Sequence, residues 1–251
     1  MKLGAQFYSI RDVCKTPEEL RQSFRRIKEI GYDSVQISGV GESVTAKDIA
    51  ACVAEFDLPA ASTHSPFERI VHDTNALIAE HKLFGASEIG IGGLGRPKDL
   101  ETARAQLTEL RFAAQKIRAA GLTFAFHNHS YEFADLGGGV SMFTIMAEEC
   151  PEINFIFDVY WAVYAGQDPV AFIRRFGNRM TNIHFKDMKT APQGPICPCG
   201  EGIIDFAPIY DACREVGIQN VFVEQDNAPD FGDSIGQMAV SYKNLAPLFG
   251  K

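Results

Sequence analysis

Short apolar runs alternate with longer amphipathic segments along this chain, and that alternation constrains the fold more than any other feature of the sequence. The runs have the length and composition of buried strands, and the segments repeat apolar residues with the period of a helix. Strict alternation predicts parallel pairing, because the crossover between two parallel strands usually contains a helix. We expect strands at residues 3–8, 33–37, 59–63, 87–91, 122–126, 153–157, 180–185 and 220–223, and helices at 17–30, 45–56, a segment ending near 84, 99–120, 141–149, 169–176, 205–216 and 234–248.

The number of strand–helix units predicts the architecture. Eight such units in 251 residues match the size of a single (β/α)₈ TIM barrel, and no linker or charge run divides residues 1–251 into two domains. A doubly wound open sheet is the alternative, but it usually carries a glycine-rich phosphate turn after its first strand. The corresponding segment here has no glycine and reads Tyr8-Ser9-Ile10-Arg11-Asp12.

Composition limits the classes of partner. With 32 acidic and 24 basic residues the formal net charge is −8, which argues against nucleic acid because phosphate binding relies on clustered Lys and Arg. No apolar run approaches the ~18 residues of a membrane span, so no membrane partner is expected. Residues 1–10 lack a signal-peptide core, and the cysteines are dispersed, so a reducing cytoplasm is the expected location. Cys197 and Cys199 offer only two metal ligands and are expected to be free thiols.

Polar residues at the ends of the last four strands indicate where a site would lie. Side chains alternate between the two faces of a strand, and barrel active sites lie at the C-terminal strand ends. In these strands the phenylalanine and valine face is expected to pack on the helices. The opposite face ends in His127, Asp158, His184 and Glu224, which are expected to converge on one pocket at the barrel mouth.

Carboxylates and imidazoles in one buried pocket need a compensating charge. A divalent cation is the economical solution, and this donor set suits Mn²⁺, Mg²⁺, Co²⁺ or Zn²⁺. Such an ion acts as a Lewis acid on a carbonyl or hydroxyl of the substrate. Each residue alone could instead hydrogen-bond a loop, but that interpretation weakens for four residues in register.

Motifs in the C-terminal half resemble those of the xylose isomerase-like barrels, in their sugar phosphate isomerase/epimerase branch. In chain order they are His127-Asn128-His129-Ser130-Tyr131-Glu132-Phe133, Phe157-Asp158-Val159-Tyr160-Trp161, His184-Phe185-Lys186-Asp187-Met188, Gly200-Glu201-Gly202-Ile203-Ile204-Asp205 and Val223-Glu224-Gln225-Asp226. The resemblance implies one divalent metal, Mn²⁺ being the expected ion, bound by a Glu, Asp, His, Glu set. Asp158, His184 and Glu224 match the last three positions. His127 stands where many members have the first Glu, so Glu132 is expected to replace it.

The resemblance also implies an activity. It is that of an isomerase or epimerase acting on a sugar, keto-sugar or related polyol by proton transfer through a metal-bound enediolate. Glu132 and Glu224 are then catalytic, and the displaced first Glu makes His127, His129 or Lys186 a candidate general base. The resemblance implies a homodimer or homotetramer as the assembly. The candidate substrate-binding residues are Gln6, Gln36, His64 and Trp161.

Three other interpretations stay open. The same site would suit a lyase or dehydratase, as in the related inosose dehydratases and the lyases of 3-keto sugars. A sugar-binding barrel with a catalytically dead site is the non-enzymatic alternative. A related branch contains AP endonucleases, but those generally carry more metal ligands and a basic DNA groove, which this acidic chain does not show clearly. Phosphate recognition is not evident either, because Gly92-Gly93-Leu94-Gly95 lacks the Lys and Ser/Thr of a P-loop.

Overall fold

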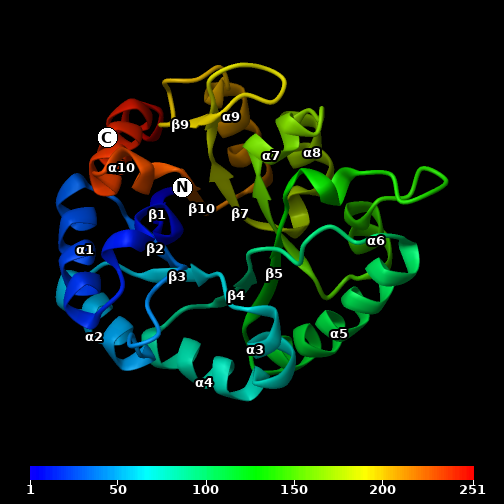
Figure 1. The fold of residues 1–251 in the computed structure, drawn as a ribbon, viewed down its shortest axis with the longest axis horizontal. Helices are drawn as coiled ribbons and strands as arrows, with labels where there is room; N and C mark the ends of the chain where they lie inside the picture. Colours follow the sequence, from blue (N-terminus) through cyan, green and yellow to red (C-terminus); the bar gives the residue numbers. More distant parts are fainter.

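Eight parallel strands form the inner wall of the protein, in a computed structural model that describes residues 1–251. They are hydrogen-bonded in the order β3-β2-β1-β10-β7-β6-β5-β4 and are surrounded by a ring of helices (Figure 1). The first and last strands of this order, β3 and β4, pair with each other only through the bridge between His64 and Gly90, so the barrel is nearly closed. The TIM barrel prediction is confirmed. The strands are β1 Lys2–Gln6, β2 Ser34–Ile37, β3 Ala60–Thr63, β4 Glu88–Ile91, β5 Thr123–His127, β6 Asn154–Asp158, β7 Met180–Phe185 and β10 Asn220–Val223.

The helices follow the expected segments closely, because their ends carry strong capping signals. In α1 the Thr16 hydroxyl accepts from the Glu19 N–H and the Glu19 carboxylate accepts from the Thr16 N–H, while Gly31 ends the helix at φ +115°. The segment ending near residue 84 is two helices, which meet at the non-helical Asp73. The helices are α1 Pro17–Ile30, α2 Ala46–Phe56, α3 Phe67–His72, α4 Thr74–Phe84, α5 Leu100–Ala119, α6 Met142–Glu149, α7 Val159–Tyr164, α8 Pro169–Phe176, α9 Phe206–Val216 and α10 Ser234–Leu245.

The core lies between the strands and the helices, on the face that the alternation predicts. Phe157 of β6 stacks on Phe172 of α8 with ring centroids 5.9 Å apart, and Phe185 of β7 stacks on Phe206 of α9 at 4.6 Å. Phe157, Phe185 and Phe206 are buried, and Phe172 is half-buried. Since one face of each strand is committed to this packing, the residue next along the strand must point into the barrel. No helix in the structure is long and apolar enough to cross a membrane.

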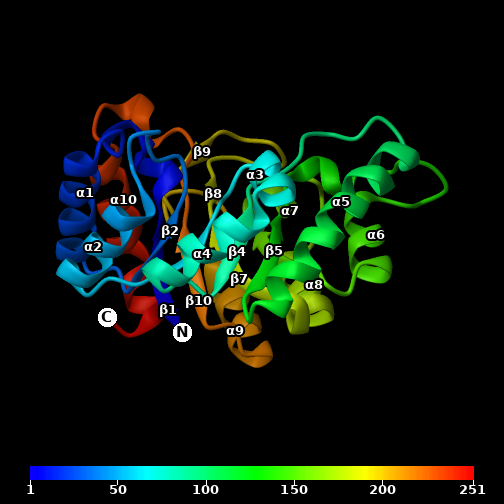
Figure 2. The same cartoon turned by 90° about the horizontal axis from the view of Figure 1, so that it is seen from below.

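A short antiparallel pair after β7 shapes the loop over one side of the barrel mouth. It consists of β8 Asp187–Met188 and β9 Ile196–Cys197, and Figure 2 shows it at the end of the barrel opposite the N-terminus. The buried Asp187 carboxylate accepts N–H groups from Met188, Gly200, Gly202 and Ile204 at 2.7–3.1 Å, which fixes the path of this loop. Cys197 and Cys199 are buried within it and are free thiols.

Candidate active site

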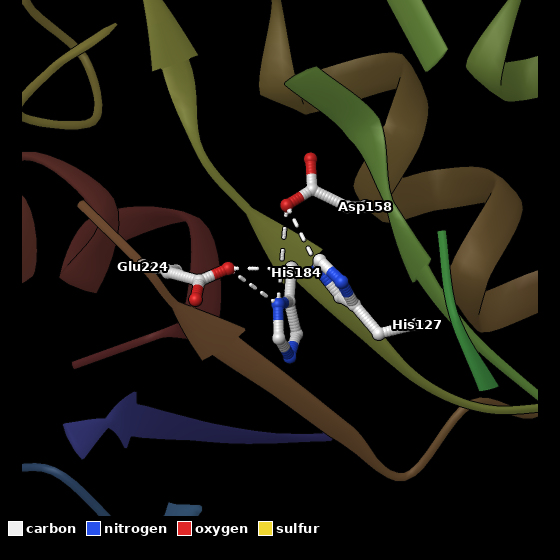
Figure 3. A group of neighbouring side chains, drawn as sticks. All are labelled: His127, Asp158, His184 and Glu224. Carbon is white, nitrogen blue, oxygen red and sulfur yellow. Dashed lines mark hydrogen bonds and ion pairs between the residues drawn. The ribbon is translucent and has the colours of Figure 1, made fainter. Parts of the chain in front are cut away.

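Four side chains from neighbouring strands meet at the C-terminal mouth of the barrel (Figure 3). His127, Asp158 and His184 lie on β5, β6 and β7, and Glu224 directly follows β10. Each offers one ligand atom, these atoms lie within 4.8 Å of one another, and all four residues are buried. The structure thus brings together the four residues that strand alternation alone predicts to converge.

Two carboxylate oxygens stand at the centre of this group. Asp158 Oδ2 lies 3.3 Å from His127 Nε2 and 3.9 Å from His184 Nδ1. Glu224 Oε2 lies 2.8 Å from His184 Nδ1 and 3.7 Å from His127 Nε2. Both imidazoles therefore face the same pair of oxygens.

Lys186 adds a positive charge to the group. Its side chain is only 1% exposed, and its Nζ lies 3.2 Å from Asp158 Oδ2, 3.1 Å from Glu224 Oε2 and 3.0 Å from Asp226 Oδ1. Burial alone would lower the pKa of Lys186, but these carboxylates outweigh burial and raise it well above its usual range. Burial likewise would raise the pKa of Glu224, but the neighbouring Lys186 holds it well below the usual value, so Glu224 is ionised.

The pKa values of His127 and His129, at the end of β5, are shifted in opposite directions. Burial would lower the pKa of His127, but its hydrogen bond to Asp158 and the nearby Glu224 carboxylate raise it to about 9. Burial lowers the pKa of His129 to about 3, and the charge of the neighbouring His127 adds to the effect. A protonated and a neutral imidazole thus lie side by side, with ring centroids 4.9 Å apart. Such a divergence of pKa values is what separate acid and base roles require.

A chain of hydrogen bonds from the other side of the barrel fixes the tautomer of His184. The Ser62 hydroxyl donates to Glu88 at 2.6 Å and accepts from the Gln36 amide nitrogen at 3.1 Å. The amide oxygen of Gln36 therefore faces His184 Nε2, 2.7 Å away, and that nitrogen must donate. Burial lowers the pKa of His184, so its Nδ1 carries a lone pair directed at the carboxylates.

These contacts make the group suitable for a divalent metal. A lone pair on His184 Nδ1 and a carboxylate oxygen 2.8 Å apart repel each other unless a cation lies between them. Two imidazoles with two carboxylates form a typical donor set for Mn²⁺ or Zn²⁺. Because His127 must lose its proton to become a ligand, binding would release a proton. The group can therefore bind a divalent metal ion.

Glu132 lies outside this group, although the family resemblance favoured it as the first ligand. It is buried in the turn Ser130–Phe133, where Glu132 Oε2 accepts the backbone N–H of His129 at 2.7 Å. Burial raises its pKa to about 7. His127 takes the position beside Asp158 and Glu224. The role of Glu132 as a metal ligand and catalytic group therefore stays a prediction, and this arrangement does not favour it.

The candidate substrate-binding residues separate into cavity-lining and supporting groups. A cavity of about 390 Å³ opens above the cluster and is lined by His64, His127, His129, Lys186 and Glu224. Gln6 and Gln36 are fully buried, and each holds a histidine: Gln6 Nε2 lies 3.1 Å from His64 Nδ1, and Gln36 contacts His184. Trp161 does not line this cavity but packs on His129, with ring centroids 5.3 Å apart.

Several cavity residues were not among the expected site residues, Asp226 and Ser38 among them. Asp226 lines the cavity and contacts Lys186, and its place two residues after Glu224 was the available signal. Ser38 also lines it, one residue beyond the end of β2, where no pattern distinguishes a site serine from an ordinary turn residue.

A parallel barrel with a buried acid–histidine group at its mouth has its polar site where the active sites of such barrels lie. The chain belongs to the xylose isomerase-like TIM barrel family, whose family model matches residues 24–237. An inosose dehydratase from Lacticaseibacillus casei is 24% identical over 139 residues, covering 49% of this chain and 46% of that protein. The chain thus spans about half the length of the curated relatives it matches.

Solved structures show the same fold over the whole chain. A sugar phosphate isomerase/epimerase from Parabacteroides distasonis superposes with a TM-score of 0.82 at 22% identity, covering 98% of this chain and 95% of that chain. An L-ribulose 3-epimerase superposes with a TM-score of 0.74 at 15% identity, covering 98% and 94%. The resemblance deduced from the motifs is confirmed. These relatives are named as isomerases, epimerases and dehydratases, which supports an enzyme without deciding between the reactions.

Proposed function

We propose that this protein is a divalent-metal-dependent isomerase or epimerase of a sugar, keto-sugar or related polyol. The reaction would remove a proton from the carbon beside a carbonyl group and return a proton to the resulting enediolate. The observation that carries the proposal is the buried group of His127, Asp158, His184 and Glu224, which opens into a cavity of about 390 Å³. The proposed ion is Mn²⁺, and a homodimer or homotetramer in the cytoplasm stays a prediction.

The residues of the site have two proposed roles, which are to hold the ion and to move the proton. His127, Asp158, His184 and Glu224 would hold the metal, which when bound supplies Lewis-acid stabilisation of negative charge on substrate oxygen atoms. The placement of Glu132 in its turn supports His127 as the fourth ligand.

Glu224 is the proposed proton acceptor, since it is ionised and lines the cavity. His129 lines the cavity from the β5 side and is neutral, so it is the proposed partner that relays a proton on the other side of the substrate. The Lys186 ammonium would hold developing negative charge on the substrate, and His64, whose Nε2 is buried without a partner, would bind a hydroxyl.

A lyase or dehydratase is the second candidate, and one observation favours it. The β5 position carries His127 rather than a carboxylate, so the site has one glutamate base in the cavity instead of two. The first step would be the same proton removal by Glu224. The C–O bond at the next carbon would then break, the Lys186 ammonium would give a proton to the leaving oxygen, and an unsaturated ketone would remain. The inosose dehydratase relatives are consistent with this outcome.

The experiment that tests the proposal is incubation with keto-sugars in D₂O, followed by mass spectrometry and NMR of the products. An isomerase or epimerase incorporates deuterium into a recovered or isomeric sugar of unchanged composition. A lyase gives an unsaturated product and releases water or an alcohol. A binding protein without activity gives neither product after Mn²⁺ is restored, and that result across a panel of keto-sugars and keto-polyols would refute an enzymatic role.

A further inference from the structure

One buried carboxyl group lies outside the candidate active site but is joined to it by hydrogen bonds. Glu88 is the first residue of β4, is only 5% exposed, and does not line the cavity above the four-residue group. Its Oε1 accepts from the Ser62 hydroxyl at 2.6 Å and from the Asn182 amide nitrogen at 2.7 Å. No cation is among its side-chain partners. Because burying such a group costs free energy, Glu88 depends on these hydrogen bonds.

The Ser62 hydroxyl has one proton to donate, and its two neighbouring acceptors are unequal. The Glu88 oxygen lies at 2.6 Å, within the range of hydrogen bonds to a charged acceptor, whereas the Thr63 carbonyl is 3.5 Å away. Burial raises the pKa of Glu88, and the bonds from Ser62 and Asn182 oppose the rise because they favour the charged form. The proton of Ser62 therefore goes to Glu88, and Ser62 accepts from Gln36.

A hydrogen-bonded chain between Glu88 and His184 has two possible directions. In one direction every group donates toward Glu88, and Nε2 of His184 holds the proton. In the reverse direction Ser62 donates to Gln36, and the turned amide of Gln36 donates to Nε2 of His184. The proton of His184 then lies on Nδ1 and is donated to Glu224 Oε2, 2.8 Å away. An amide has a donor and an acceptor side, so the Gln36 side chain fits both directions.

A carboxylate stands at each end of this chain, and only one of them can receive its protons. Glu224 also has the Lys186 ammonium at 3.1 Å, so it does not depend on a donor from His184. Glu88 has no such cation, and reversal of the chain would remove the Ser62 donor and leave it the bond from Asn182. The direction of the chain is therefore set at the Glu88 end.

We propose that Glu88 is a positioning residue, which acts through Ser62 and Gln36 to hold the proton of His184 on Nε2 and to leave Nδ1 free for a divalent ion. Glu88 itself lies too deep in the barrel to line the cavity. The tautomer of His184 follows from the hydrogen bonds alone, whereas its consequence for metal affinity rests on the proposed function.

The test locates the proton of His184 by NMR, in metal-free protein labelled with ¹⁵N-histidine. Protonated and unprotonated ring nitrogens have well-separated ¹⁵N chemical shifts, and His184→Gln identifies the His184 signals by their loss. Glu88→Leu removes the acceptor at the end of the chain, and Ser62→Ala breaks the same chain with a smaller change in packing. Asn182→Ala is the matched control, because it removes the other bond to the same Glu88 oxygen and leaves the chain intact.

Nε2 of His184 should carry the proton in wild type and in Asn182→Ala. In Glu88→Leu and Ser62→Ala the proton should move to Nδ1, and calorimetry should show an affinity for Mn²⁺ that is about tenfold lower. A wild-type ring protonated on Nδ1, alone or together with Nε2, would overturn the inference. So would a proton that stays on Nε2 in both chain variants, or one that moves equally in Asn182→Ala, since general packing would then explain it.

The two readouts separate this inference from the proposed function. If the proton moves as described but neither wild type nor the variants bind Mn²⁺, the positioning role of Glu88 stands and the metal proposal fails. If all variants bind Mn²⁺ equally and the proton stays on Nε2, the metal proposal stands and Glu88 has no positioning role.

Discussion

The two arcs of the barrel mouth differ in the kind of polar residue they carry. The arc made by β5, β6, β7 and β10 carries charged groups: Asp158, Glu224, Lys186 and a protonated His127. At the mouth, the arc made by β1, β2, β3 and β4 contributes amides, hydroxyls and a neutral histidine. We call these the charged arc and the neutral arc. Under the proposed function, the charged arc would perform the chemistry and the neutral arc would position it.

The arcs are connected rather than independent. A charge buried without a partner is expensive, so the charged arc keeps its carboxylates within 3.3 Å of Lys186 or of the protonated His127. In the neutral arc, Gln6 and Gln36 each contact a histidine, while His64 Nε2 has no partner. The bond from Gln36 to His184 orients a side chain of the charged arc. If this description is right, substitutions in the charged arc should change catalysis and stability, and substitutions in the neutral arc should change the orientation of its partners.

The largest effect is expected in the charged arc from Glu224→Gln. Removal of the proposed proton acceptor should lower the rate of deuterium exchange by about 10³-fold and should also reduce bound metal. Glu215→Gln is the matched control, since Glu215 is an exposed residue of α9 that pairs only with Arg174. Wild-type activity together with wild-type metal content in Glu224→Gln would contradict both roles of this residue.

Lys186→Met should cost the metal-free protein about 3 kcal/mol of unfolding free energy. Three carboxylates would lose the ammonium that lies within 3.2 Å of each, and breaking a buried ion pair is strongly destabilising. Saturating Mn²⁺ should restore much of the loss, because the ion replaces the missing charge and binds only the folded state. Lys189→Met, at a half-exposed position three residues on, should leave the denaturation midpoint unchanged. If Mn²⁺ stabilises wild type and Lys186→Met equally, the ammonium and the ion do not serve the same carboxylates.

His81 on α4, behind the neutral arc, and His127 in the charged arc should respond to pH in opposite ways. Burial lowers the pKa of His81 from 6.5 to about 4, so His81 stabilises the fold above pH 6.5 and this contribution is lost as pH falls toward 4. Between pH 7 and pH 5 the wild-type protein should therefore lose about 2 kcal/mol that His81→Gln does not lose.

His72→Gln is the control for this measurement, because the His72 side chain is 67% exposed. Chemical denaturation across this pH range provides the comparison. Parallel pH profiles for wild type and His81→Gln would show that His81 is not held neutral. His127 differs from His81 because Asp158 and Glu224 raise its pKa to about 9, so its stabilising effect disappears only as pH rises through 9.

The smallest effect should come from the contact between the arcs. Gln36→Leu removes the acceptor that keeps the proton of His184 on Nε2, so the affinity for Mn²⁺ should fall by about tenfold. Gln6→Leu changes a buried amide of the same arc that contacts His64 instead, and should leave Mn²⁺ affinity unchanged. Calorimetric titration distinguishes the two variants. Equal losses in both would mean that the neutral arc acts by general packing and does not orient His184.

The sequence predicted the charged arc better than the neutral arc, for physical reasons. Alternation along a strand is enforced by backbone geometry, so the positions of His127, Asp158, His184 and Glu224 follow from the apolar residues beside them. Glu132 is different because it lies in a turn beyond β5, where alternation no longer applies. The family resemblance favoured it as a ligand, while the structure uses it to cap that turn.

Other features depend on packing that no local pattern records. A cavity of about 680 Å³ between α2 and α4 arises from the relative placement of two helices and the ends of two strands. Helix α7 has only six residues, too few to display a helical period, and it begins directly after Asp158, which caps it. The contact of Gln36 with His184 joins residues 148 positions apart in the chain, and only the closing of the barrel brings them together.

The most direct test of the account is the position of a divalent ion in the crystal. Crystals grown with Mn²⁺ should show one strong anomalous peak at the mouth of the barrel, at bonding distance from His127, Asp158, His184 and Glu224, with Lys186 displaced or repositioned beside it. An absent peak at this position, despite Mn²⁺ bound in solution, would contradict the central claim. A peak on Glu132 without His127 would contradict the assignment of the fourth ligand.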